Sequence, residues 1–360
     1  MSTTDQAAPE APQAPPDADD ERLGQSHGLA KLLRRPEIGA AVAALAIFIF
    51  FATTTSAFVK PGGASTWLFT SSQIGIMAVA VALLMIGGEF DLSAGAMVGT
   101  TGLTTGILMT EYHANVWFSI LLALLIAVGV GILNGVLVMR TGLPSFIVTL
   151  GSFFVLQGVN LAVTKQLIGK VSVTGLNREP GYEQGQQLFG SFVKFDLPSG
   201  TLTVYAATFW WIAVTVIATW VLLRTKSGNW IFAVGGAQIS ARQVGVPVFA
   251  TKVGLFVTTA VAGWLVGMLS LFKTTTVQST TGVGQEFIYI ICAVVGGCLL
   301  TGGYGSAVGA ALGALIYGMV NQGIVYEGWD NDWLYAFLGV MLLGAVLVNN
   351  WVKARAEAVR

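Results

Sequence analysis

The stretch GGEFDLSAG at residues 87–95 places two carboxylates between apolar segments that would otherwise form one long hydrophobic block. Charged side chains at membrane depth are costly, and they normally face the interior of a helix bundle or a water-filled cavity. The glycines permit a break in the helix, and Asp91 or Ser93 can accept free backbone N–H groups at the start of the next helix. The stretch therefore predicts two helices separated by a polar break inside a membrane.

Apolar runs along most of the chain have the length of membrane-spanning helices. The 360 residues are 54% hydrophobic and 10% charged, whereas about 25% of residues are charged in an average soluble domain. A helix needs roughly 20 apolar residues to cross the hydrocarbon core. We therefore predict an all-α integral membrane protein with about ten transmembrane helices, some of them interrupted. The expected spans are 38–58, 67–87, 93–110, 116–139, 145–164, 203–223, 251–272, 286–300, 305–323 and 333–350.

The basic residues predict an orientation. Lys31, Arg34 and Arg35 precede the first span, which places the N-terminus in the cytoplasm, and ten crossings return the C-terminus to the same side. The proline-rich, acidic tail at 1–36 is expected to be disordered and cytoplasmic. The expected domain organisation then continues with a transmembrane domain at 37–352, which includes an extracytoplasmic segment at 165–202 and a cytoplasmic loop at 224–250, and a cytoplasmic tail at 353–360.

The charge balance and the residue types exclude several functions. The net charge is zero and basic residues do not cluster on one face, so nucleic acid is not an expected partner. The two histidines and two cysteines, His27, His113, Cys292 and Cys298, lack the spacing of a metal site. No G-x-x-x-x-G-K-[ST] motif occurs, so we expect no ATP hydrolysis, no cofactor and no enzyme activity in this chain.

A weak internal similarity relates the break to a second glycine-rich stretch. Gly87-Gly88 followed by GAMVG at 95–99 resembles Gly296-Gly297 followed by GSAVG at 305–309, with one additional residue between them. Transporters often contain structural repeats with interrupted helices at matching positions. Because chance similarity is common in glycine-rich helices, the repeat is a hypothesis.

Several polar residues are candidates for a translocation pathway, although each has a structural alternative. Asp91 can be a simple helix cap, and Glu286 can be an ordinary acid in a first helical turn. A cap does not explain the neighbouring Glu89. Asn134 and Gln157 lie within apolar runs and suit either a polar solute or a neighbouring helix. The candidate pathway residues are Glu89, Asp91, Ser93, Asn134, Gln157 and Glu286.

The loop at 224–250 contains a second informative stretch, RTKSGNWIFAVGGAQISARQVGVP at residues 224–247. It predicts a short amphipathic helix at 237–244, with glycines on both sides and a proline after it. One interpretation is a docking helix for a cytoplasmic partner. The alternative is a plain inner loop that lies in the lipid headgroups.

At these two stretches the chain resembles the permeases of sugar-type ABC importers, the ribose-permease-like group of a superfamily that includes branched-chain amino-acid permeases. The resemblance spans roughly residues 36–352, and residues 87–95 match the group's G-G-x-x-D-L-S-x-G signature. Ala237 and Ser240 depart from the asparagine and alanine common there. The residues that follow the pattern of the group's coupling loop are Gly228, Ala233, Gly235, Gly236, Ala241, Arg242, Gly245 and Val246.

This resemblance implies a function and a set of partners. It implies the translocation subunit of an importer for a simple sugar or polyol of the pentose or hexose class, in the plasma (inner) membrane of a bacterium. The implied partners are a second permease copy in a homodimer, a cytoplasmic ABC ATPase that hydrolyses ATP, and an extracytoplasmic sugar-binding protein. The implied ATPase-coupling residues are Gly235, Gly236, Ala241, Arg242 and Gly245.

Other functions remain open from the residues alone. In a proton-coupled secondary transporter of a small polar solute, Glu89, Asp91 and Glu286 would carry protons. An ABC permease for another small solute, such as an amino acid, is a further alternative. A membrane enzyme is disfavoured because the sequence offers no positioned nucleophile or metal site.

Overall fold

The computed structural model describes the backbone of residues 36–358 and the side chains of residues 37–347. Residues 1–35 of the predicted N-terminal tail, which include Lys31, Arg34 and Arg35, therefore lie outside the described residues, as do residues 359–360. The last helix continues to Ala358, through most of the predicted C-terminal tail.

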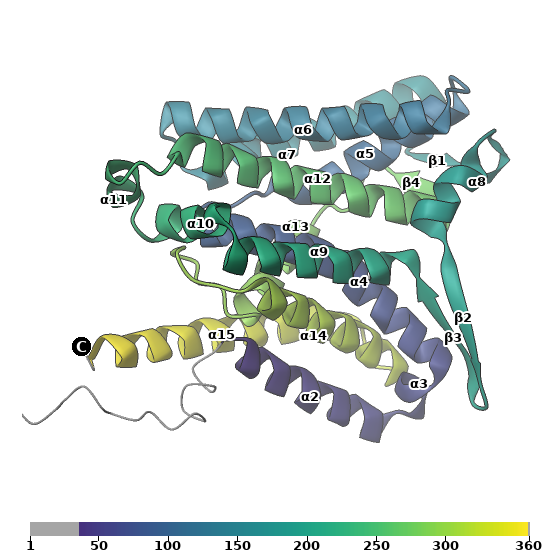
Figure 1. The fold of residues 1–360 in the computed structure, drawn as a ribbon. Coiled ribbons are helices and arrows are strands. Elements are labelled where there is room, and N and C mark those ends of the chain that lie inside the picture. The colour runs from purple at the N-terminus through teal and green to yellow at the C-terminus, as the bar shows by residue number, and fades with distance from the viewer. Residues whose placement is uncertain (1–35, 359–360) are drawn as a thin grey trace, which may run out of the picture. The chain divides into compact units, whose positions relative to one another are not determined.

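The described chain is built mainly from helices (Figure 1). The elements are α2 (Pro36–Thr54), α3 (Ser56–Val59), α4 (Pro61–Ile86), α5 (Ser93–Thr110), α6 (Val116–Thr141), α7 (Ser145–Ile168), β1 (Ser172–Thr174), η2 (Leu176–Arg178), α8 (Tyr182–Gly185), η3 (Gln186–Gly190), β2 (Phe192–Leu197), β3 (Gly200–Tyr205), α9 (Ala206–Arg224), α10 (Lys226–Gly236), α11 (Gln238–Gln243), α12 (Val248–Thr274), β4 (Thr276–Gln278), α13 (Gln285–Val295), α14 (Ala307–Tyr326) and α15 (Trp333–Ala358).

Each predicted span coincides with a helix, which confirms the all-α integral membrane fold. Within the described residues, seven helices are long and apolar enough to cross a membrane, namely α2, α4, α6, α7, α9, α12 and α14. α5 has 18 residues. α13 has only 11 residues, about 16 Å at 1.5 Å per residue, so it crosses roughly half of the hydrocarbon core. The sequence predicted a complete span there.

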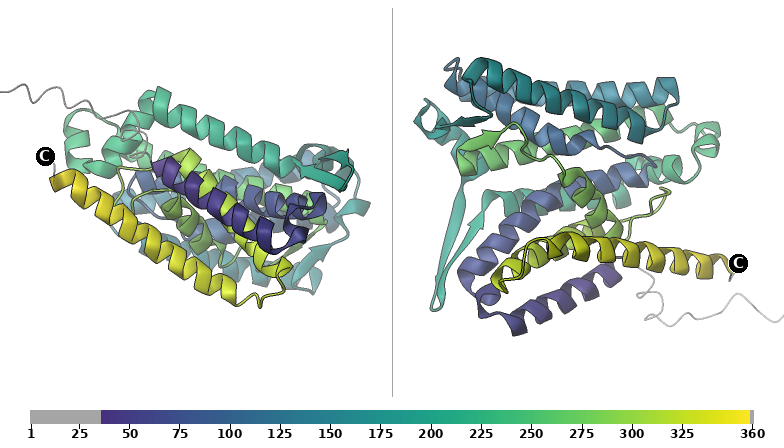
Figure 2. Two further views of the ribbon diagram at one scale, coloured as in Figure 1. Left: turned by 90° about the horizontal axis from the view of Figure 1, so that it is seen from below. Right: turned by 180° about the vertical axis from the view of Figure 1, so that it is seen from behind.

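α4 is the central helix of the bundle. All its residues from Ile74 to Ile86 are buried, and it packs against α9, α12, α13 and α14. Figure 1 and the right panel of Figure 2 show α6 and α7 on one side of α4, and α2, α14 and α15 on the other. α6 and α7 expose many apolar side chains, as expected for helices that face lipid.

The segment at 165–202 begins within α7 and contains short strands. β1 pairs antiparallel with β4, and β2 pairs antiparallel with β3. β3 continues to Tyr205, so α9 begins three residues after the predicted start of that span. The Thr203 amide donates a hydrogen bond of 2.7 Å to Ser65 Oγ on α4. In Figure 1 the β2–β3 hairpin and α11 lie at opposite ends of the bundle, called here the hairpin end and the α11 end.

Candidate functional site

The polar break between α4 and α5 is formed by a glycine-terminated helix end. Gly88 has a φ of 82°, a left-handed conformation that favours glycine. The amides of Gly87, Gly88 and Glu89 donate to the carbonyls of Leu83, Met85 and Leu84, respectively. The last turn of α4 therefore closes on its own carbonyls, and the chain leaves the helix axis at Glu89.

A second break, between α13 and α14, has the same backbone pattern. Gly297 has a φ of 92°, and the amides of Gly296, Gly297 and Cys298 donate to residues four, three and five positions earlier, as in the first break. The internal similarity predicted from the sequence is thus present in the structure. Both breaks lie together, because the Gly303 amide donates a hydrogen bond of 2.8 Å to the Ile86 carbonyl.

Asp91 lies at the start of α5 and is almost fully buried. Its Oδ1 accepts hydrogen bonds from the Ser93 amide at 2.8 Å and from Ser93 Oγ at 2.5 Å. Asp91 thus satisfies a free amide at the start of α5, as the sequence suggested, although Leu92 occupies the N-cap position itself. A buried carboxylate close to a helix N-terminus is stabilised by these donors and by the helix dipole.

Ser93 connects Asp91 to the side chains of α6 and α7. Asn134 Nδ2 donates to Ser93 Oγ at 3.0 Å, and Asn134 Oδ1 accepts from Ser152 Oγ at 2.5 Å. Asn134 is fully buried. The break, α5, α6 and α7 therefore share one continuous chain of hydrogen bonds. Gln157 takes no part in it and is only half-buried.

α7 also satisfies the backbone of the break. The Phe90 amide donates to Ser145 Oγ, and the Leu92 amide donates to Thr149 Oγ1, both at 3.1 Å. Buried backbone donors need such partners because the membrane interior offers no water. The unwound segment is therefore held in place by side chains of a neighbouring helix.

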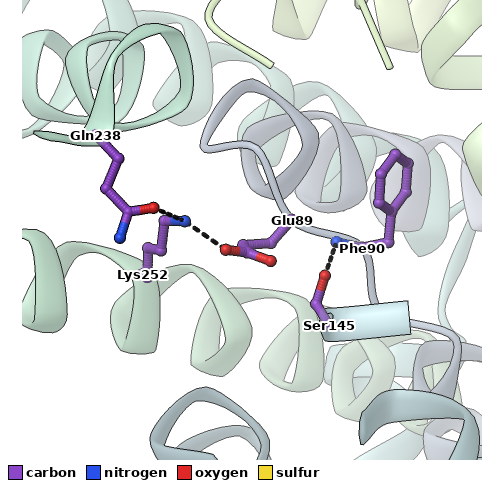
Figure 3. A network of polar contacts seen from close by, with 5 residues as sticks. All are labelled: Glu89, Phe90, Ser145, Gln238 and Lys252. Carbon is purple, nitrogen blue, oxygen red and sulfur yellow. Dashed lines mark hydrogen bonds and ion pairs between the residues drawn. The ribbon is translucent and has the colours of Figure 1, made fainter. Parts of the chain in front are cut away.

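Glu89 has a different environment from Asp91. Its carboxylate forms an ion pair with Lys252 Nζ on α12, and the same Nζ donates to Gln238 Oε1 on α11 at 2.8 Å (Figure 3). Both charged residues are buried, at 8% and 5% exposure. The sequence indicated Glu89 as a pathway residue but gave no signal for this partner, which is 163 positions away.

Glu286 lies in the first turn of α13 and is buried. Its Oε2 accepts a hydrogen bond of 3.0 Å from the Gly284 amide. It also lies against Gly95, where an added Cβ would overlap the carboxylate. The N-terminal turn of α5 is therefore flanked by two buried carboxylates, Asp91 and Glu286.

Asn160 is a buried polar residue that the sequence interpretation missed. It is 5% exposed, lies on α7, and its Nδ2 has no hydrogen-bond partner. The Cβ position of Gly99 on α5 is 3.6 Å from this nitrogen. An asparagine within an apolar run was the same signal that selected Asn134, but it does not tell which polar residue of α7 faces inward.

The predicted coupling loop is more helical than expected. α11 confirms the short helix predicted at 237–244, and α10 adds a second helix before it. Ala241 is buried, whereas Arg242 and Gly245 are exposed. Gly235 packs directly on the Ile86 carbonyl, and Gly236 lies beside Gly303.

The residue types near the break define what it can bind. Within the described residues, no group of three or more His, Cys, Asp or Glu side chains is placed to hold a metal ion. Cys292 and Cys298 are free and buried. The side chains that gather at the break are carboxylates, hydroxyls and amides, which suit hydrogen bonding to an uncharged polar solute.

An interrupted helical bundle with buried polar groups at its breaks defines a multi-pass membrane permease. Residues 63–346 match the family described as "Branched-chain amino acid transport system / permease component", and the chain belongs to this family. The resemblance to sugar-type ABC permeases is thereby confirmed.

Curated relatives cover most of the chain. It is 28% identical over 310 residues to the ribose import permease protein RbsC of Escherichia coli (strain K12), with 86% of this chain and 92% of that protein covered. It is 29% identical over 330 residues to the xylose/arabinose import permease protein XylH of Sulfolobus acidocaldarius, covering 89% and 87%. The fructose import permease protein FruG of Bifidobacterium longum is 26% identical over 326 residues, covering 89% and 92%. No solved structure matches the chain.

Proposed function

We propose that this chain is the membrane-spanning permease subunit of an ABC importer for a simple sugar or polyol of the pentose or hexose class. The observation that carries the proposal is the break at 87–95, where a chain of hydrogen bonds from Asp91 through Ser93 and Asn134 to Ser152 joins the break to α5, α6 and α7. The relatives named as ribose, xylose/arabinose and fructose permeases support the solute class.

The breaks offer a physical basis for a gated path. Unwound segments with short half-helices expose backbone and side-chain polar groups inside the bundle, and they can change conformation without unfolding a complete helix. The buried polar groups around α5 are suited to hydroxyl-rich solutes, since hydroxyls both donate and accept hydrogen bonds.

The energy source in this proposal is a separate ATPase. A cytoplasmic ABC ATPase that binds and hydrolyses ATP docks on α10 and α11, and an extracytoplasmic sugar-binding protein delivers the solute at the hairpin end. Two copies of this chain form a homodimer. The α11 end faces the cytoplasm in this arrangement, with the N-terminus on the same side.

Uptake measurements test this function. Bacteria without their own sugar permeases would express the chain with its cognate ATPase and binding protein, and would receive radiolabelled ribose, xylose, fructose or galactose. Uptake of at least one sugar is expected, and replacing the Walker-motif lysine of the ATPase should abolish it. Uptake that survives this substitution but collapses with a protonophore would contradict the proposal and favour proton coupling.

A further inference from the structure

The ion pair of Glu89 and Lys252 joins three separate elements near the first break. Glu89 belongs to the break, Lys252 to α12, and Gln238, which accepts a hydrogen bond from the same ammonium group, is the first residue of α11 (Figure 3). Each hydrogen bond from the lysine ammonium group to a carboxylate or amide oxygen is directional. The side chains therefore connect the predicted docking helix to the chain two residues before Asp91.

A backbone contact connects α10, the helix before α11, to the same break. Gly235, in the last turn of α10, lies so close to the Ile86 carbonyl that an added Cβ would overlap it. The Cβ position of Gly302, in the second break, is 2.8 Å from Gly88 Cα and 2.9 Å from the Gly235 carbonyl oxygen. We call residues 86–88, 235–236 and 302–303 the glycine junction. Here α10 contacts both breaks without intervening side chains.

In the described part of the chain, the outer surface of α11 is exposed and could contact a partner protein. Ile239 and Val244 are each 79% exposed, and Arg242 is exposed between them. A partner bound to this surface would move α11 directly. The contacts of Gln238 and Lys252 would transmit that displacement to Glu89, and the contact of Gly235 would transmit it to Ile86.

Stability alone is a weak reason for a buried ion pair. The cost of desolvating two charges roughly offsets their attraction, and well-packed apolar residues often stabilise such a site equally well. The best-attested use of a buried polar pair is to fix a register or to act as a switch between arrangements. A pair that spans a docking helix, α12 and a helix break is placed for that use.

We propose that Lys252 is a positioning residue that couples α11 to the first break through Glu89 and Gln238. The inference rests on the proposed function and adds the route by which the ATPase acts on the path. Glu89 is then part of the coupling machinery, whereas Asp91 bonds to Ser93 at the start of α5.

The test measures coupling in proteoliposomes that contain the complete importer and the sugar, among ribose, xylose, fructose and galactose, that the wild type imports fastest. The main variant is Glu89→Gln/Lys252→Met, which removes both charges and leaves no lone buried ion, so it should assemble normally. We expect the ATP hydrolysed per sugar imported to rise by about ten-fold, within the range of coupling between distant sites. Gln238→Ala should raise this ratio to a smaller extent, because one hydrogen bond is lost while the ion pair remains.

Matched variants separate coupling from structure. Lys165→Met and Gln166→Ala, two exposed residues in the last turn of α7 and away from α11, should keep the wild-type ratio. If the double variant assembles and keeps the wild-type ratio, or loses transport only in proportion to lost complex, Lys252 is merely structural and this inference is wrong. If the wild-type complex imports none of the sugars with ATP, the proposed function itself fails.

Discussion

Asp91 accepts two hydrogen bonds from Ser93 and is surrounded by protein, so its carboxylate depends on these local donors in place of water. Asp91→Asn keeps the shape and one acceptor oxygen but loses the charge-assisted bonds. We predict a loss of about 1 kcal/mol in the stability of the folded chain, typical of a weakened helix cap. Sugar uptake should fall several-fold while the assembled complex remains.

The control for this prediction is Asp330→Asn in the exposed turn before α15, where the Asp332 amide donates to the aspartate in a solvated position. This variant should retain wild-type uptake and stability. Wild-type uptake by Asp91→Asn, measured per assembled complex, would show that Asp91 is only a structural cap.

Asn160 offers a test in which stability and transport should change in opposite directions. Its Nδ2 is buried without a partner, which costs free energy in the folded state. Asn160→Leu has a similar volume and should raise the stability of the chain by about 1 kcal/mol. If the amide serves the solute, uptake should fall, with KM raised more than the maximal rate. Thermal unfolding and uptake kinetics together decide, and unchanged kinetics would place Asn160 off the path.

At this scale, sequence patterns identified residues whose chemistry is local. The cap by Asp91 and its bond to Ser93 follow from neighbours in the chain. The partner of Glu89 is distant in sequence, and Lys252 stands near the predicted inner end of a span, where a lysine normally reaches water. Gln157 and Asn160 lie on an apolar helix without a polar face, so periodicity could not tell which one is buried.

Among the elements, the glycine junction gives a sharp prediction. Gly235→Ala would force its methyl group into the Ile86 carbonyl, and we expect a destabilisation of about 1–3 kcal/mol, the usual cost of overpacking. Gly236→Ala is the matched control. The nearest atom to its added methyl group, beyond the local chain, is Gly303 Cα at 3.8 Å, an ordinary contact distance. Thermal unfolding in detergent should show that Gly235→Ala is less stable than Gly236→Ala. Equal stability would mean that the backbone of the junction shifts easily to accommodate a methyl group.

α11 makes a separate prediction about assembly. Arg242 is exposed at its C-terminal end, so Arg242→Glu should leave the stability of the isolated chain within about 0.5 kcal/mol of wild type. If α11 docks on the ATPase, a reversed charge in the interface should weaken co-purification of the ATPase strongly. Arg140→Glu, an exposed arginine in the last turn of α6, is the control. Equal recovery of ATPase with both variants would argue against docking at α11.

For the whole molecule, the sequence predicted which segments are helical better than how they cross the membrane. Ten apolar runs became helices because hydrophobic length is a local property. The sequence did not predict that α13 is a half-helix, because the apolar run continues past Gly296, where the helix ends. The similarity of the two stretches was visible in the sequence only as matching glycines, yet both breaks have the same capping bonds and lie together beside α10. A shared position for two breaks lets one partner act on both.

The orientation of the bundle can be tested with the full chain, because its natural cysteines are buried and should react little with a membrane-impermeant maleimide. Ser199→Cys lies in the exposed turn between β2 and β3, and Ser240→Cys lies on the exposed side of α11. If the α11 end is cytoplasmic, intact cells should label only Ser199→Cys, and inside-out vesicles should label only Ser240→Cys. The reverse pattern would place α10 and α11 outside the cell, where an ATP-hydrolysing partner cannot work, and would overturn the importer proposal at its root.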